Sequence, residues 1–517
     1  MRRRISNRQR MIAGVAVIAV AAVIAPVAWS VVGDAPRHVA APKKCRTVTH
    51  GTAPGPAPHP ARKTAAKAPA VNAPPADFDN DGHPDLALSG GGDVDLNWIA
   101  GSVEVAYGSG DGTGVGRCQY LTQADAGIPG EARDEAEFGF ETVARDFDDD
   151  GYTDLAAAVF EKDGTHVIIL WGSEHGLSSA TRVPGTDRSH VPGTQDGVIE
   201  EQLAAGDFDG DRHADLVFGL GSEKGLLKGP FQRNGAPADT GPVPAPRLPD
   251  RLPSELAYSD LVAGDLNGDG TDDLVSFHTD DDGDSDWSQL HWVGNYLQGG
   301  KNGFAKPDST HIPDAETATV GDVDGDGYAD LIVSPRGERA SRNSVTVVYG
   351  TKSGPGKRTA TLDRDTPGVP GKEPQDNDAV FTSLDAGDVN GDGYADVVAG
   401  APRSRVYAAR GTEQVLLFQG GPHGLTGKGA RQLDQRDVHA IPDKDDNFGE
   451  SVLLTDMNGD HKADLTVSAP GDDKGRSSAW LLPGSADGLS TQGVTHLPGT
   501  SFADPKGDLM MGDRVAR

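Results

Sequence analysis

One acidic loop occurs seven times in this chain of 517 residues, and it constrains the fold more than any other feature. Each copy reads Asp-x-Asp/Asn-x-Asp, three further residues, and then Asp-Leu or Asp-Val, with apolar segments nearby. We number the loop positions 1 to 9, from the first Asp to the last. The copies begin 69, 61, 58, 57, 66 and 68 residues apart. Repetition at such a period indicates an array of small structural units, such as a propeller or a solenoid.

Oxygen-bearing side chains fill positions 1, 3, 5 and 9 of every copy, with Asp at 25 of these 28 places and Asn at three. Such oxygens converge when the loop curls tightly, which glycine at position 4 or 6 allows. Hard oxygen ligands on a flexible loop suit Ca²⁺, whereas Mg²⁺ retains its waters and Zn²⁺ prefers nitrogen or sulfur. The alternative is an acidic Asx-turn loop without metal. Seven such loops would leave carboxylates repelling one another at close range, which favours calcium.

We therefore expect up to seven Ca²⁺ ions with a mainly structural role. The predicted ligands are Asp77, Asp79, Asp81 and Asp85 in loop 1; Asp146, Asp148, Asp150 and Asp154 in loop 2; Asp207, Asp209, Asp211 and Asp215 in loop 3; Asp265, Asn267, Asp269 and Asp273 in loop 4; Asp322, Asp324, Asp326 and Asp330 in loop 5; Asp388, Asn390, Asp392 and Asp396 in loop 6; and Asp456, Asn458, Asp460 and Asp464 in loop 7. Position 7 can add its main-chain carbonyl oxygen.

The charge of the chain is unevenly distributed. Residues 1–76 hold twelve Lys or Arg and a single acid, so they carry +11, and the net charge of −31 for the whole chain leaves −42 on residues 77–517. A phosphate backbone would be repelled by such a body, which argues against nucleic acid as a partner. Only 36% of residues are hydrophobic, while Gly and Pro number 69 and 35. This composition favours many short strands joined by tight turns.

The amino terminus predicts export. Five arginines within residues 1–10 precede an uncharged stretch over residues 11–33. This is typical of a signal peptide, with cleavage expected after Ser30. The stretch is also long enough for an uncleaved anchor. Either reading of residues 1–33 places the body in the medium or at the outer face of the membrane, so membrane contact is expected only through that anchor.

An Ala- and Pro-rich basic stretch at residues 34–76 shows no hydrophobic periodicity and is predicted to be a disordered linker. The chain has two cysteines, Cys45 in this linker and Cys118 in the body. Export would permit a disulfide between them, and the sequence leaves that pairing open.

Short motifs around the loops suggest a family. Phe-Gly precedes two loops, at 138–139 and 448–449, and Gly-Ala-Pro at 400–402 with Ser-Ala-Pro at 468–470 follows two others. With these motifs the loops resemble the FG-GAP repeats of integrin α-subunit head domains and the VCBS-type repeats of bacterial exported proteins. The resemblance covers residues 77–517 and departs in loops 3 and 4, where both motifs are missing. It implies an all-β fold, a seven-bladed β-propeller with calcium in the loop between the first and second strands of each blade.

The end of the chain suggests how such a propeller would close. Residues 511–517 align with the segments 138–145 and 448–454 that lead into loops 2 and 7, to within about one residue. We predict that 511–517 forms the inner strand of the blade whose other strands begin at Leu86, so that no sheet edge is left open. Third strands are expected near 103–107, 167–171, 344–349, 415–418 and 479–482. Trp171 and Trp480 on these strands are expected to pack between blades.

A ligand is expected on the face opposite the calcium loops, because variable loops on a rigid frame commonly carry function. Basic residues in adjacent predicted loops there would suit an acidic polysaccharide; the alternative is that these side chains are solvated or paired locally. The candidates are Arg336, Arg339, Arg342, Arg403, Arg405 and Arg410, with Lys474 and Arg476 in a third loop. A further acidic run at 280–287 is more simply a solvated loop than an eighth cation site.

Catalytic motifs are lacking in the sequence: it has no Gly-x-Ser-x-Gly elbow, no phosphate-binding Gly-rich loop and no His-Glu-x-x-His. His83, His213 and His461 lie inside acidic loops and are interpreted as loop residues. Similar calcium-bearing propellers form the body of some polysaccharide lyases and of a phospholipase D, so a lyase acting through the Arg-rich face is the alternative. We expect a monomeric, non-catalytic recognition or adhesion module whose partner is an extracellular protein or an acidic polysaccharide.

Overall fold

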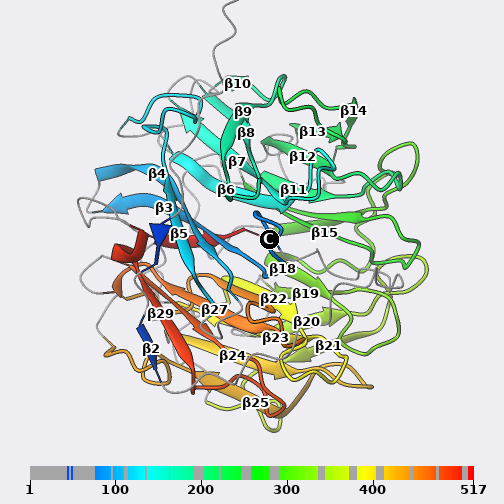
Figure 1. Ribbon diagram of the computed structural model, residues 1–517. Helices are drawn as coiled ribbons and strands as arrows, with labels where there is room; N and C mark the ends of the chain where they lie inside the picture. Colours follow the sequence, from blue (N-terminus) through cyan, green and yellow to red (C-terminus); the bar gives the residue numbers. More distant parts are fainter. Residues whose placement is uncertain are drawn as a thin grey trace, which may run out of the picture. The chain divides into compact units, whose positions relative to one another are not determined.

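Seven antiparallel sheets follow one another along the chain in the computed structural model, and each is a blade of a seven-bladed β-propeller (Figure 1). They belong to one unit, Arg37–Arg517. The structure describes residues 43–45, 48–50, 76–94, 97–109, 114–133, 137–161, 164–189, 202–220, 223–245, 258–279, 292–335, 344–371, 381–402, 413–442, 446–472, 477–502 and 511–516. Among these residues, no helix has the length and apolar character needed to cross a membrane.

Blades 1 to 3 contain the first half of the strands. Blade 1 has β3 (Leu86–Val94), β4 (Asn97–Tyr107) and β5 (Arg117–Leu121), joined by β1 (Lys43–Lys44) and β30 (Met511–Val515); blade 2 has β6 (Glu137–Arg145), β7 (Asp154–Glu161), β8 (Gly164–Trp171), β9 (Ser179–Arg182) and β10 (Arg188–Ser189); blade 3 has β11 (Gln202–Gly206), β12 (Asp215–Leu220), β13 (Glu223–Lys228) and β14 (Asp239–Pro242).

Blades 4 to 7 contain the rest. Blade 4 has β15 (Tyr258–Gly264), β16 (Asp273–Thr279) and β17 (Trp292–Leu297); blade 5 has β18 (Ala315–Gly321), β19 (Asp330–Pro335), β20 (Val345–Val348) and β21 (Thr359–Leu362); blade 6 has β22 (Ser383–Gly387), β23 (Asp396–Ala401), β24 (Gln414–Gln419) and β25 (Thr426–Leu433); blade 7 has β26 (Val452–Thr455), β27 (Asp464–Ala469), β28 (Ser478–Leu482) and β29 (Val494–Pro498), joined by β2 (Val48–His50) and followed by the 3₁₀ turn η2 (Gly499–Phe502).

The middle strands of the blades are buried on both faces, because each blade is packed between two others. All eight residues of β8 and the first six of β7 are buried, and each strand contains a continuous apolar run, 155–160 in β7 and 167–171 in β8, rather than an alternating pattern. Of the outer strands, β9 is mostly half-buried and β14 is mostly exposed. This gradient matches the rule that strands covered on both sides lose the alternation of apolar and polar residues.

Seven apolar clusters lie between consecutive blades, one for each neighbouring pair. Trp171 belongs to the cluster between blades 2 and 3, and Trp480 to the cluster between blades 6 and 7, as the sequence predicted. The cluster between blades 7 and 1 joins Leu88 of β3 to Leu481 of β28. The hydrophobic core is therefore a ring of interfaces rather than one central mass.

The C-terminal strand lies in blade 1. β30 pairs antiparallel with β3, with Val515 opposite Leu88 and Arg514 opposite Ser89, and it also lies against β6, β27 and β28. The first strands of the other blades contact one another in order, from β6 through β11, β15, β18 and β22 to β26. β30 thus occupies in blade 1 the sheet position that β6 occupies in blade 2.

Part of the predicted linker is ordered instead. β1 pairs with β5 at the edge of blade 1, and β2 pairs with β29 at the edge of blade 7. A disulfide joins Cys45, just after β1, to Cys118 on β5. The linker prediction is wrong for these residues, because a covalent tie and two open sheet edges order strands too short to show a periodicity in sequence.

Candidate metal centres

The acidic loops share one backbone conformation. Loops 2 to 7 connect the first and second strands of their blades, and loop 1 leads directly into β3. Positions 4 and 6 have positive φ angles in every copy, for example 74° at Gly325 and 90° at Gly327 of loop 5. Where glycine is absent, Asn80 and Asp149 fill position 4, and Arg212 and His461 fill position 6. These left-handed residues produce the tight curl.

The Asp at position 1 and the Asp at position 5 stabilise this curl by accepting main-chain hydrogen bonds. In loop 2, Oδ2 of Asp146 accepts the N–H of Gly151 at 2.9 Å, and Oδ1 of Asp150 accepts the N–H of Tyr152 at 3.0 Å. The equivalent pair recurs in all seven loops. The loop therefore has an Asx-turn frame whether or not it binds an ion.

The Asp at position 9 joins the loop to the sheet. Its Oδ1 accepts the N–H of the glycine that ends the third strand in every blade, as Asp154 does from Gly172 at 2.8 Å. Its Oδ2 accepts the N–H of position 2 in five loops, as Asp154 does from Phe147 at 3.0 Å. Side chains are excluded from Gly172, because a Cβ there would collide with the carbonyl oxygen of Thr153. In the five loops where Oδ2 accepts the N–H of position 2, each oxygen of position 9 keeps one lone pair for a further partner.

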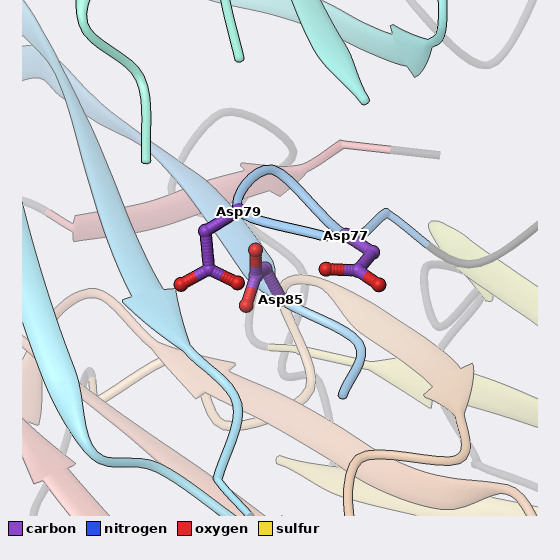
Figure 2. Close-up of side chains that lie close together, drawn as sticks. All are labelled: Asp77, Asp79 and Asp85. Carbon is purple, nitrogen blue, oxygen red and sulfur yellow. The ribbon is translucent and has the colours of Figure 1, made fainter. Parts of the chain in front are cut away.

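Side-chain oxygens of positions 1, 3 and 9 converge in loops 1, 2, 3 and 5, where all three residues are Asp. In each of these loops the three oxygens lie within 4.8 Å of one another. Figure 2 shows the carboxylates of Asp77, Asp79 and Asp85 turned toward a common point. Position 5 lies outside this group, and positions 3 of the other three loops are Asn.

Several oxygens of the convergent aspartates in loops 2 and 5 are buried without a hydrogen-bond partner. They are Oδ1 of Asp146, Oδ1 of Asp148 and Oδ1 of Asp324. The side chains of Asp148 and Asp324 are only 8% and 6% exposed. A buried carboxylate oxygen without a donor is costly, so these atoms identify where a cation would fit. The donor set of carboxylate oxygens is the one that Ca²⁺ prefers.

Burial raises the pKa of the position-9 carboxyls far above the usual Asp value. Desolvation is the main cause in every blade, and neighbouring loop aspartates add to it. The pKa rises to about 8 for Asp154 and Asp464, and to about 7 for Asp215 and Asp330. A cation among these oxygens would favour their ionised form and lower these values.

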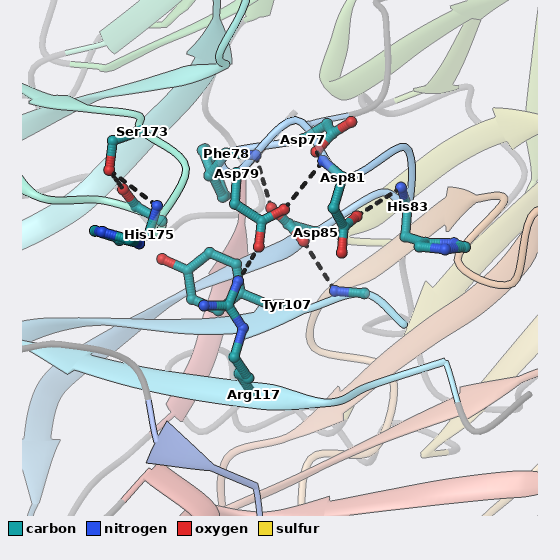
Figure 3. Close-up of polar contacts among 12 residues, drawn as sticks. Asp77, Phe78, Asp79, Asp81, His83, Asp85, Tyr107, Arg117, Ser173 and His175 are labelled. Carbon is teal, nitrogen blue, oxygen red and sulfur yellow. Dashed lines mark hydrogen bonds and ion pairs between the residues drawn. The ribbon is translucent and has the colours of Figure 1, made fainter. Parts of the chain in front are cut away.

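A basic side chain contacts the position-3 carboxylate in each of the four convergent loops. Arg117 pairs with Asp79, Arg233 with Asp148, Lys228 with Asp209 at 2.8 Å, and Arg358 with Asp324 at 2.5 Å. Figure 3 shows Arg117 reaching Asp79 beside the ring of Tyr107. In all four pairs the basic group holds Oδ2 of the aspartate.

Hydrogen bonds between neighbouring loops connect the blades. The N–H of position 8 donates to the position-1 carbonyl of the preceding loop in five neighbouring pairs, as Thr153 does to Asp77 at 3.0 Å. The ring nitrogen Nδ1 of His213 in loop 3 lies 2.5 Å from Asp149 of loop 2. A change that stabilises one loop is therefore expected to stabilise its interface with the next blade as well.

All 28 predicted ligands lie among the described residues, and the structure brings positions 1, 3 and 9 together in loops 1, 2, 3 and 5. The predicted basic ligand-binding residues Arg336, Arg339, Arg342, Arg403, Arg405 and Arg410, with Lys474 and Arg476, lie outside the described residues, as does the acidic run at 280–287. Sequence reasoning missed the four basic partners of position 3. These residues are separated from their loops by different numbers of residues, and Arg233 reaches loop 2 from blade 3. No fixed sequence spacing could therefore predict them.

Three segments of the chain match the FG-GAP repeat, at residues 315–348, 380–418 and 448–482. They coincide with the first three strands of blades 5, 6 and 7. The chain therefore carries FG-GAP repeats, as the sequence motifs suggested.

Two curated proteins show distant similarity to parts of the chain. Integrin alpha-PS2 of Drosophila melanogaster is 27% identical over 240 residues, which cover 44% of this chain and 16% of that protein. Phosphatidylinositol-glycan-specific phospholipase D of Bos taurus is 29% identical over 159 residues, covering 29% of this chain and 18% of that protein. The chain thus spans less than a fifth of either relative.

Solved structures of other propellers are also similar. A lectin of Agrocybe aegerita, described as recognising non-reducing terminal N-acetylglucosamine, matches with a TM-score of 0.42 and 13% identity, over 84% of this chain and 97% of that one. The Dos1 propeller matches with a TM-score of 0.40 and 8% identity, over 77% and 87%. Likeness at this level does not bear on function.

Proposed function

We propose that this FG-GAP-repeat propeller is an exported, calcium-stabilised protein that serves as a non-catalytic recognition or adhesion module at the cell surface or in the medium. The observation that supports the proposal most directly is the set of convergent aspartates, with buried, unpaired oxygens at Asp146, Asp148 and Asp324. A protein that leaves such oxygens without donors gains stability when a cation fills the space between them.

Calcium is the ion that these loops suit best. Positions 1, 3 and 9 supply carboxylate or amide oxygens, position 5 supplies another, and nitrogen or sulfur ligands do not occur at these positions. Ca²⁺ accepts six to eight such oxygens at about 2.3–2.6 Å and tolerates irregular geometry, whereas Mg²⁺ requires a near-ideal octahedron. Because the loops also carry hydrogen bonds between blades, bound calcium would stabilise the ring as well as each loop.

Export is supported by two independent features. A disulfide joins Cys45 to Cys118, and disulfides persist mainly in oxidising compartments outside the cytosol. The basic, then apolar, N-terminal sequence has the form of a secretion signal or anchor. Together with the similarity to an integrin α subunit, the disulfide points to an extracellular protein.

Closure of the ring by β30 is part of the proposal. The pairing of β30 with β3 places residues from both ends of the propeller sequence in one sheet. We propose that this shared blade closes the propeller without an open strand edge, an arrangement that removes a site for edge-to-edge aggregation. Deleting residues 511–517 should then lower the unfolding midpoint and produce aggregates in size-exclusion chromatography; an unchanged monomer would contradict closure.

The partner proposed is an extracellular protein or an acidic polysaccharide, bound by a monomer. We would test the polysaccharide with the full chain and immobilised polygalacturonate, using a neutral glucan as control and calcium throughout. Selective retention without release of unsaturated uronates supports binding without catalysis. Release of such products would support the alternative of a lyase, while equal behaviour on both polymers would favour a protein partner.

The calcium proposal itself is tested by thermal unfolding. The full chain is compared at millimolar calcium, with a chelator, and with magnesium in place of calcium. Native-state binding at 100 times Kd contributes about 2.7 kcal/mol for each site. We expect a large fall in the unfolding midpoint with chelator that calcium restores and magnesium does not. Identical midpoints in the three conditions would contradict the proposal.

A further inference from the structure

Position 3 divides the seven loops into two classes, and a residue on another strand divides them in the same way. Asp occupies position 3 in loops 1, 2, 3 and 5, and Asn in loops 4, 6 and 7. The second residue precedes the glycine whose N–H is accepted by the position-9 aspartate, and we call it the pre-glycine residue. In the Asp class it is Tyr107, Trp171, Lys228 and Tyr349; in the Asn class it is Gln298, Gln419 and Pro483.

In the Asp class the pre-glycine residue is either a lysine or an aromatic residue whose ring contacts an arginine. Lys228 is itself the basic partner of Asp209. The other three are aromatic, and an arginine lies over each ring: Arg117 over Tyr107 at 4.8 Å, Arg233 over Trp171 at 4.8 Å, and Arg358 over Tyr349 at 3.5 Å from the ring centroid. These are the same arginines that hold the position-3 aspartates. The ring face attracts the guanidinium and holds it in place.

In the Asn class the pre-glycine residue is neutral, and no basic side chain among the described residues is paired with position 3. The amide oxygens of Asn267, Asn390 and Asn458 each accept the N–H of position 5, at 2.9, 2.8 and 2.9 Å. Lys462 in loop 7 pairs with Asp460 at position 5, at 3.3 Å. Position 3 therefore carries no net charge in any loop, either as Asn or as a paired Asp.

We propose that the pre-glycine residue tunes the calcium affinity of its loop by fixing the charge around position 3. The inference deepens the calcium proposal and rests on it. A position-3 carboxylate is almost entirely buried, with 3%, 8%, 9% and 6% of the side chain exposed in the four loops, and requires a counter-charge when no ion is bound. The same counter-charge repels Ca²⁺ and leaves only one oxygen of the aspartate for the ion. The basic partner thus stabilises the calcium-free loop and weakens its affinity for calcium.

Loops 3 and 4 provide matched variants for the test. Lys228→Gln gives loop 3 the residue that loops 4 and 6 have at this place, and Asp209→Asn gives it the position-3 residue of the Asn class. The reciprocal pair, Gln298→Lys and Asn267→Asp, converts loop 4 to the Asp class. Each loop lies in its own stretch of sequence, so hydrogen exchange with peptide-level mass spectrometry reports seven calcium midpoints separately, and the unchanged loops are internal controls.

For loop 3 we expect Lys228→Gln to lower the calcium midpoint about tenfold and Asp209→Asn to raise it about tenfold. The double variant should return to within about threefold of the unmodified loop, because the charge around position 3 is again zero. For loop 4, Gln298→Lys should raise the midpoint about tenfold, and the added Asn267→Asp should restore it. The loop 4 variants keep the test decisive if a loop 3 variant fails to fold.

The outcomes separate the two proposals. If the loops respond to calcium but Lys228→Gln leaves its midpoint unchanged or raises it, the lysine acts only by positioning Asp209 and the inference is overturned. A double variant whose midpoint stays more than about threefold away from that of the unmodified loop would overturn it as well. If no loop responds to calcium, the calcium proposal fails and the inference fails with it.

Discussion

Loop 3 (207–215) and loop 4 (265–273) lie in adjacent blades and are built on the same main-chain frame. In both, the position-1 carboxylate accepts the N–H of position 6, at 2.9 and 2.8 Å, and the position-9 carboxylate accepts the N–H of the strand-ending glycine, at 2.9 Å. They differ in what surrounds position 3, which is Asp209 held by Lys228 in loop 3 and Asn267 in loop 4. The comparison shows that the two loops share one hydrogen-bonded frame, whereas the charge around position 3 differs and depends on a residue of another strand as well as on position 3 itself.

The largest effect should come from removing calcium, and it should differ between the classes. With chelator, loops of the Asn class lose the ion and have no basic group at position 3, while loops of the Asp class keep their paired carboxylate. Even three occupied sites would contribute about 8 kcal/mol at 100 times Kd, taking about 2.7 kcal/mol for each. We expect faster amide exchange in loops 4 and 6 than in loops 3 and 5 after chelation. Equal exchange in both classes would mean that the basic partners do not stabilise the empty loops.

The pH dependence of the calcium-free protein should be the next largest effect and should be common to both classes. The position-9 carboxyls have raised pKa values in the folded state, about 8 at Asp154 and about 7 at Asp396, against 3.8 for an ordinary Asp. A raised carboxyl pKa destabilises the fold where the group is ionised, so stability rises as the pH falls from about 8 to about 5. One fully realised shift from 3.8 to about 8 corresponds to on the order of 5 kcal/mol.

Millimolar calcium should reverse this trend, because protons and calcium then compete for the same oxygens. The measurement is urea unfolding at several pH values, with chelator and with calcium. If the free energy of unfolding depends on pH in the same way with chelator and with calcium, these carboxyls do not bind the ion.

Removing a position-9 aspartate should cost about the same in either class, since the frame is shared. Asp154→Ala in loop 2 and Asp396→Ala in loop 6 each leave two main-chain N–H groups without their acceptor, both buried in loop 2 and one buried and one part-buried in loop 6. An unpaired buried donor costs about 1–3 kcal/mol, so we expect a loss of about 2–6 kcal/mol in the free energy of unfolding for each variant. Urea unfolding in the presence of a chelator measures the cost of the lost hydrogen bonds without a contribution from metal binding. A cost confined to one class would break the equivalence of the frames.

The disulfide offers a further comparison between loops 1 and 5. Arg117 is followed directly by Cys118, whereas Arg358 of loop 5 has no covalent tie nearby. Closing a loop of 73 residues is worth about 4 kcal/mol in the chain-entropy model, as an upper value. Cys45→Ser should therefore lower the unfolding midpoint and speed amide exchange at β5 and loop 1, while exchange at loop 5 stays unchanged. Equal acceleration at loops 1 and 5 would show a general loss of stability without any local effect on Arg117.

Much of the fold and the place of the acidic loops could be predicted from the sequence, because both follow from spacing. Oxygen-bearing residues at fixed loop positions and apolar runs on either side indicate the repeat number and the strand order. The strands β1 and β2 could not be predicted, since two or three residues show no periodicity and are ordered by pairing with distant strands. The position-9 aspartates were predicted as ligands, but their role as main-chain acceptors depends on a glycine that lies 14 to 26 residues further along the chain.

The smallest effect should come from the aromatic rings that support the arginines of the Asp class. Trp171→Leu keeps an apolar side chain at the pre-glycine position of loop 2 but removes the ring over which Arg233 lies. A partly exposed cation–π contact contributes about 0.5–1 kcal/mol, and Arg233 retains its contacts with Asp148 and Asp150. Because that contact is small, we expect the calcium midpoint of loop 2 to fall by at most about two- to fivefold. The matched control is Trp480→Leu, which removes a comparable buried ring from blade 7 without touching an arginine of this set. Both variants lose core packing. The ring of Trp171 therefore helps to hold Arg233 only if the calcium midpoint of loop 2 shifts in Trp171→Leu and does not shift in Trp480→Leu. An unchanged loop 2 midpoint would mean that Asp148 and Asp150 hold Arg233 without help from Trp171, and the class distinction would then depend on the ion pair alone.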